Sequence, residues 1–114
     1  MIPDFPLSSA PLCIVGNINR DVKVLGIADA AGVLSDGETS VPRIVETIGG
    51  GGANSACAAA ALGAAVRFLG RVGDDPLANQ LQATLVRHGV QTHLKRDGRY
   101  PTGTIPVWAV DRNG

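Results

Sequence analysis

The sequence has few aromatic residues and no excess of either charge. Aromatic side chains make up 4% of the 114 residues within a hydrophobic content of 45%, so the core has to be built from aliphatic side chains and alanine. Ten basic and ten acidic residues give a formal charge of zero. This balance argues against a nucleic-acid partner, because such proteins usually carry a basic surplus. A chain of this length forms one domain at most.

Cysteine and long apolar runs are also scarce. Residues 56–66 form the longest stretch free of charge and strong polarity. They fall well short of the roughly 20 apolar residues that cross a membrane, so no membrane partner is expected. Prolines within residues 1–9 argue against a secretory signal. Cys13 and Cys57 lie far apart in apolar surroundings. We therefore expect buried free thiols, no metal site and a cytoplasmic protein.

The hydrophobic pattern predicts an α/β fold: a layered, mostly parallel sheet with flanking helices. Short apolar runs typical of strands buried on both faces alternate with two helical segments. The first helix follows a glycine run, and the second begins with an Asp-Pro pair, which is a strong helix start. In the second helix, Leu77, Leu81 and Leu85 recur every four residues and form one apolar stripe. The expected strands cover residues 11–15, 65–70 and 90–94, and the expected helices end before Gly63 and Gly89.

A small peripheral sheet is expected beside this layer. Residues 21–27 and 39–47 alternate loosely between apolar and polar side chains, which indicates half-exposed strands. Pro42 places the second of these strands at a sheet edge, because proline cannot donate a hydrogen bond to a neighbouring strand. Residues 104–110 form another strand-like run, and residues 28–38 are expected to be a loop.

The end of the sequence predicts that the domain is truncated. Residues 111–114 finish on Asn-Gly, which is a strong hairpin signal and calls for a following strand. A last strand left without a partner is rare, because an exposed edge promotes aggregation. We therefore interpret residues 1–114 as the N-terminal part of a longer domain.

The glycine run at positions 49–52 leads into Ala53-Asn54 at a predicted helix start. Such a start attracts anions, but no lysine follows as in a Walker loop, and the dinucleotide spacing is absent. A neutral polyhydroxylated ligand such as a sugar suits a helix start without obstructing side chains, with the carboxamide of Asn54 beside it. Equally, the glycines could serve only a tight turn, with Asn54 as the N-cap.

A second group of polar residues follows the first expected strand, at the sheet edge where open α/β sheets bind ligands. Asn19 and Asp21 are two residues apart, so in an extended segment they point the same way and could bind adjacent hydroxyl groups. The alternative is an Asx turn, which is the favoured interpretation for Asn17. The spacing of His88 and His93 fits no metal site. Asp75 is expected to cap the second helix and, with neighbouring Arg and Asp residues, to form a solvated rim around the start of that helix.

In this order, these segments resemble the N-terminal part of the ribokinase-like (phosphofructokinase B type) carbohydrate kinases. The family transfers the γ-phosphoryl group of ATP to a sugar or related hydroxyl. The resemblance implies that Asn19, Asp21, Gly50, Gly51 and Asn54 bind the sugar or nucleoside, that the small sheet is a lid, and that lid strands could pair two subunits. It rests on residues 15–21, 37–39, 48–56, 63–64, 72–75 and 102–104.

The resemblance also implies what this chain does not supply. The anion hole and catalytic Asp of the family lie in a Gly-Ala-Gly-Asp motif that does not occur by Gly114. ATP and Mg²⁺ are thus expected for the full-length protein and not for this chain alone, which should contain no catalytic residue and be inactive. Gly51 stands where ribokinases proper often have lysine. The competing interpretations are a non-enzymatic sugar- or nucleoside-binding module and a nucleotide-binding α/β domain.

Overall fold

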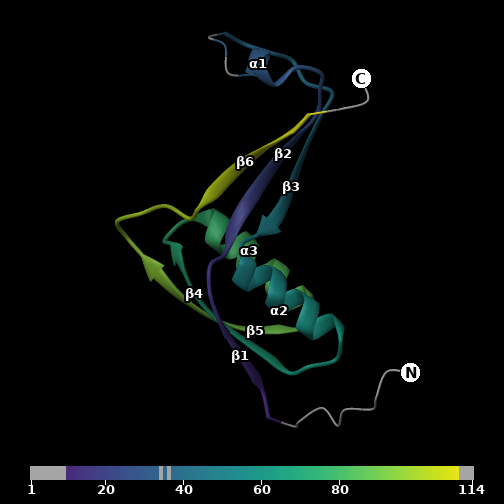
Figure 1. Cartoon of the computed structure of the whole chain (residues 1–114). Coiled ribbons are helices and arrows are strands. Elements are labelled where there is room, and N and C mark those ends of the chain that lie inside the picture. Colours follow the sequence, from purple (N-terminus) through teal and green to yellow (C-terminus); the bar gives the residue numbers. More distant parts are fainter. Residues whose placement is uncertain (1–9, 34, 36, 111–114) are drawn as a thin grey trace, which may run out of the picture.

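The part of the chain that the structure describes forms two three-stranded sheets (Figure 1). The structure is a computed structural model that describes residues 10–33, 35 and 37–110. The expectations for residues 1–9 and for the turn at 111–114 lie outside this range. The elements are β1 Leu12–Val15, β2 Asn19–Ile27, α1 Ala30–Val33, β3 Arg43–Gly49, α2 Gly51–Ala61, β4 Val66–Gly73, α3 Pro76–Arg87, β5 Val90–Asp97 and β6 Thr104–Val110.

The first sheet confirms the predicted α/β layer. Its strands run parallel in the order β1-β4-β5. Each crossover moves one strand further in the same direction, and right-handed crossovers of this kind place both helices on one face. Helices α2 and α3 do share that face, where they build a single core cluster. Strands β4 and β5 extend three residues beyond the predicted ends, to Gly73 and Asp97.

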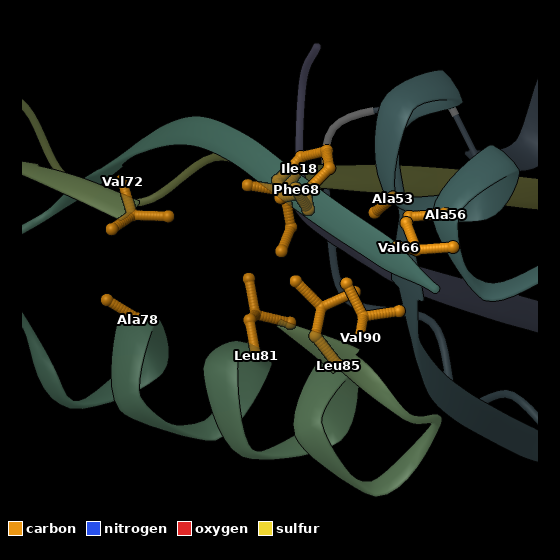
Figure 2. Packing of buried hydrophobic residues seen from close by; sticks show 10 residues of the cluster. All are labelled: Ile18, Ala53, Ala56, Val66, Phe68, Val72, Ala78, Leu81, Leu85 and Val90. Atoms are coloured by element: carbon orange, nitrogen blue, oxygen red, sulfur yellow. The ribbon is translucent and has the colours of Figure 1, made fainter. Parts of the chain in front are cut away.

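The core lies between β4 and the two helices (Figure 2). Phe68 on β4 is completely buried, and Leu85 on α3 is buried with it. Leu81 lies one turn before Leu85, so the predicted apolar stripe of α3 faces the sheet. Helix α2 contributes Ala53 and Ala56, whose small side chains allow the helix axis to lie close to the strands. The expected core of aliphatic side chains and alanine is therefore present, centred on one of the few aromatic residues.

The opposite face of this sheet is open within the described part of the chain, which corrects two expectations. Strand β1 was expected to be buried on both faces, yet Val15 is 77% exposed. Cys13 is exposed as well, and Cys57 is half-buried, so neither thiol has the fully buried position expected of it. The physical reason is the one-sided placement of α2 and α3, which leaves alternate side chains of β1 without a covering layer.

The second sheet projects away from the helices, with α1 at its far end (Figure 1). Its order is β3-β2-β6, with β2 antiparallel to β3 and parallel to β6. The strand expected from residue 39 begins only at Arg43, so Pro42 lies before β3, where it packs against Gly26. Pro106 lies within β6, which tolerates it because β6 is a sheet edge among the described strands. Helix α1 occupies part of the segment expected to be a loop.

None of the helices in the described ranges combines the length and the apolarity needed to cross a lipid bilayer. The two histidines lie on separate elements. His88 is the C-cap residue of α3, and His93 lies on β5. Positions 63 and 89, where the helices were expected to stop, are glycines with positive φ directly after the two C-caps.

Candidate functional site

The end of β1 and the start of α2 meet through backbone contacts that only glycine allows. A Cβ atom on Gly52 would lie 2.8 Å from the Cα of Gly16. Gly50 has a φ of 96°, and a Cβ there would lie 2.6 Å from the Asn17 carbonyl oxygen. The N–H of Ala53 donates to that same oxygen over 3.2 Å. The glycine run thus allows the helix start to lie directly against the residues that follow β1.

Asn17 and Gly50 share the capping of α2. The N–H of Gly52 donates to the Asn17 Oδ1 over 3.3 Å, so this side chain caps a helix 35 residues away instead of forming an Asx turn. Gly50 itself occupies the N-cap position. Asn54 lies inside the first turn and is exposed, so its interpretation as the N-cap is wrong. Within the described residues, its carboxamide makes no hydrogen bond and is free to contact a ligand.

Asn19 and Asp21 lie on one face of β2 and form a pair. The Asn19 amide Nδ2 donates to the Asp21 Oδ1 over 2.6 Å. Asn19 is 5% exposed, whereas Asp21 is half-buried. Sequence spacing predicted their common direction, and the structure adds that the amide orients the carboxylate. A carboxylate held in this way can still accept hydrogen bonds from hydroxyl groups through its remaining lone pairs.

Gly49 brings this pair to the glycine run. Strands β2 and β3 pair so that Asn19 lies opposite Gly49, immediately before the N-cap of α2. A Cβ on Gly49 would lie 2.3 Å from the Asp21 Oδ1, so the carboxylate occupies the space that a side chain would fill. The structure therefore brings Asn19 and Asp21 to the strand end that continues into Gly50 and Gly51.

Strand pairing identifies further residues around Asp21 that the sequence analysis missed. Thr47 on β3 and Ile105 on β6 both lie directly opposite Asp21 in the register. Ile105 is 48% exposed, and the Thr47 hydroxyl is buried without a hydrogen-bond partner in the described structure. No local pattern announces these positions, because strand register depends on contacts between segments far apart in the sequence.

Asp75 is not the solvated rim residue expected from the sequence, although its predicted role as N-cap of α3 is confirmed. Its Oδ1 accepts from the Ala78 N–H over 2.9 Å and from the Thr102 hydroxyl over 2.7 Å. Its Oδ2 accepts from the Thr102 N–H over 2.8 Å. The hydroxyl bond from Thr102, followed by the two backbone bonds, holds the pKa of Asp75 below its ordinary value.

The residues around Asp21 can form hydrogen bonds to a polar ligand. Within residues 10–33, 35 and 37–110, no group of three or more His, Cys, Asp or Glu side chains could hold a metal ion. The Asp21 carboxylate supplies acceptors and the glycine-rich start of α2 supplies backbone donors, while the exposed Asn54 carboxamide lies in the first turn of the same helix. This set suits the neighbouring hydroxyls of a polyol.

Comparisons with known proteins agree with the fold and the order of the segments. The pattern of the pfkB family of carbohydrate kinases matches residues 10–110. A fructokinase of Escherichia coli is 44% identical over 66 residues, which cover 57% of this chain. Two solved ribokinase structures superpose on this chain. One, from Giardia lamblia, has a TM-score of 0.77 and 25% identity over 93% of this chain. The other, from Arabidopsis thaliana complexed with ribose and ATP, has a TM-score of 0.71 and 27% identity over 86% of this chain.

The chain matches only part of each of these proteins. The matched region amounts to 22% of the E. coli fructokinase, 34% of the G. lamblia chain and 31% of the A. thaliana chain. The chain therefore spans about a third or less of the length of each of these three relatives.

Proposed function

The chain belongs to the pfkB family of carbohydrate kinases, and from this premise we propose that it forms the sugar-binding part of an ATP-dependent kinase that phosphorylates a sugar hydroxyl. One observation carries the proposal: the Asn19–Asp21 pair lies against Gly49, at the strand end that leads into the glycine-rich start of α2. A helix start of this kind next to an oriented carboxylate is suited to an uncharged polyol.

Each proposed contact has a separate role. Asp21 accepts hydrogen bonds from two sugar hydroxyls, and Asn19 holds its carboxylate in place. The backbones of Gly50 and Gly51 approach the sugar closely because no side chain intervenes. Asn54, exposed in the first turn of α2, supplies a donor and an acceptor. Gly51 has no side-chain donor, so the proposal covers sugars and nucleosides and does not single out ribose.

ATP and Mg²⁺ take part in the proposed reaction, but we do not propose that the described residues bind them. The family relatives include a ribokinase whose structure contains ribose and ATP. Among the described residues, no three or more His, Cys, Asp or Glu side chains form a group that could hold a metal ion, and the glycine run lacks the lysine of a phosphate loop. As the family resemblance implies, we assign the nucleotide, the metal ion and the catalytic base to the part of the kinase domain that this chain does not match.

The sheet β3-β2-β6 is the proposed lid. It projects from the helices and carries Asp21 at its base, so closing it over the sugar would exclude water and favour phosphoryl transfer over hydrolysis. Its exposed apolar side chains include Ile44, Val107 and Trp108. These residues lie on its two edge strands and suit the pairing of two subunits through their lids.

The experiment uses the full-length natural protein that contains this chain. Purified protein is incubated with ATP, Mg²⁺ and, in turn, fructose, ribose and adenosine, and phosphorylated product is measured. Asp21→Ala should raise the KM for the preferred substrate at least tenfold. Asp29→Ala removes an equally charged but exposed side chain near α1, and it should leave that KM unchanged.

Two outcomes would contradict the proposal. Equal effects of the two substitutions would show that Asp21 is not a substrate contact. Sugar binding without any phosphoryl transfer would favour the alternative, a non-enzymatic binding module. The 114-residue chain by itself should phosphorylate none of these compounds.

A further inference from the structure

Thr102 is one of two polar residues buried in the described structure, and Asn19 is the other. Each is 5% exposed. Thr102 comes two residues before β6, between the end of β5 and the proposed lid strand. A buried hydroxyl is costly unless its hydrogen bonds are satisfied, so its partners indicate why it is there.

The Thr102 side chain joins three separate segments. The N–H of Gly73, at the end of β4, donates to its hydroxyl oxygen over 2.9 Å. The hydroxyl in turn donates to Asp75 at the N-cap of α3 over 2.7 Å. The hydroxyl is therefore used as acceptor and donor at once, between partners 27 and 29 residues away in the sequence.

The backbone is also closely packed at this junction, which consists of Gly73, Asp75 and Thr102. A Cβ on Gly73 would lie 2.5 Å from the Thr102 nitrogen and 2.6 Å from the Asp75 Oδ2. Capping α3 requires only the bond from Ala78 to the Asp75 Oδ1. The second carboxylate oxygen is occupied by the Thr102 N–H, which goes beyond what a helix cap needs.

The next residue connects this junction to the proposed sugar site. The Gly103 carbonyl accepts a 2.9 Å hydrogen bond from the Arg20 N–H, on the strand that carries Asn19 and Asp21. A Cβ on Gly103 would lie 3.4 Å from the Cβ of Asn19, which is an ordinary van der Waals distance. The residue after Thr102 is thus tied to the strand that carries Asn19, and Asn19 donates to the Asp21 carboxylate.

We propose that Thr102 is a positioning residue: its hydroxyl, held between Gly73 and Asp75, fixes the approach to β6 so that Gly103 holds Asn19 beside Asp21. This inference rests on the proposed sugar site. Thr102 itself does not contact the substrate in this proposal. The junction affects substrate affinity indirectly, through Gly103 and Asn19.

The test compares Thr102→Val, which keeps the shape of the side chain but removes the hydroxyl, with Thr102→Ser, which keeps the hydroxyl. In the full-length protein, Thr102→Val should raise the KM for the preferred sugar about tenfold, the size expected for losing one hydrogen bond to a charged group. The KM for ATP should not change. Exchange of the Arg20 amide hydrogen should become about tenfold faster, and Thr102→Ser should restore both values most of the way.

Asp75→Asn provides a second route if Thr102→Val does not fold. Asparagine caps helices as well as aspartate does, but it replaces one of the two acceptor oxygens with a donor, so the same changes in KM and in Arg20 exchange are expected. Unchanged exchange at Arg20 and an unchanged sugar KM in both variants would overturn the positioning role. A wild-type protein that binds and phosphorylates no sugar would instead overturn the proposed function.

Discussion

The substitution Gly49→Ala tests the geometry of the site by adding a single methyl group. That methyl carbon would lie 2.3–2.5 Å from three atoms of the Asp21 carboxyl group. Ordinary contacts begin near 3.4 Å, so the carboxylate has to move by about 1 Å. The φ of Gly49 is not positive, so the backbone itself accepts alanine. Such a shift breaks the 2.6 Å hydrogen bond from Asn19.

The expected result is a large loss of sugar affinity with a small loss of stability. A misplacement of about 1 Å in a binding group can cost on the order of 10²-fold in activity. The free energy of unfolding should fall by no more than about 1–2 kcal/mol, because the clash is relieved by a half-buried side chain and not by the core. Sugar affinity is measured by calorimetric titration, and stability by urea denaturation.

Gly98→Ala is the matched control for this experiment. Gly98 also lacks a positive φ, and a Cβ there would meet no atom within 4 Å, so both affinity and stability should stay as in the wild type. If Gly49→Ala binds the sugar as tightly as Gly98→Ala does, the Asp21 carboxylate is not a substrate contact and the reasoning about the site is wrong.

Three further predictions concern stability. Gly52→Ala should cost about 1–3 kcal/mol in the free energy of unfolding, measured with urea, because its methyl group would lie 2.8 Å from Gly16 and 2.9 Å from the ring of Phe68. Phe68→Ala should cost about 3–5 kcal/mol, enough to abolish a cooperative thermal transition in a marginal domain. The pKa of Asp75 is lower in the folded protein than in the unfolded chain. The stabilisation from its hydrogen bonds is therefore fully present above the pKa of an unfolded aspartate, about 3.9, and is lost as the pH falls through the lower folded pKa. The stability difference between wild type and Thr102→Val should therefore shrink below about pH 4, and a constant difference down to pH 2 would contradict this assignment.

Local sequence signals predicted helices α2 and α3 and the mostly parallel character of the first sheet. Asp75 does cap α3, and the leucine stripe that ends at Leu85 does face the core. These features depend on residues close together in the chain, so periodicity and capping rules are sufficient. The buried faces of β1 were predicted wrongly, because whether a strand is covered depends on where the helices cross, not on the strand's own composition.

Only the features of the candidate site that depend on neighbouring residues in the chain were predicted from the sequence. Spacing alone predicted that Asn19 and Asp21 share a direction, but the role of Gly49 depends on the register between β2 and β3. The junction at Thr102 joins residues 27 and 29 positions apart, and no local motif marks it. Contacts between distant segments decide both features, and a single sequence does not reveal them.

The most direct test of the central claim is a crystal structure of the full-length protein with its preferred sugar bound. The account predicts sugar hydroxyl oxygens within hydrogen-bonding distance of the Asp21 carboxylate and the Asn54 carboxamide, with the sugar ring against the backbone of Gly50 and Gly51. A sugar bound elsewhere, with the Asp21 carboxylate still occupied only by Asn19, would contradict it.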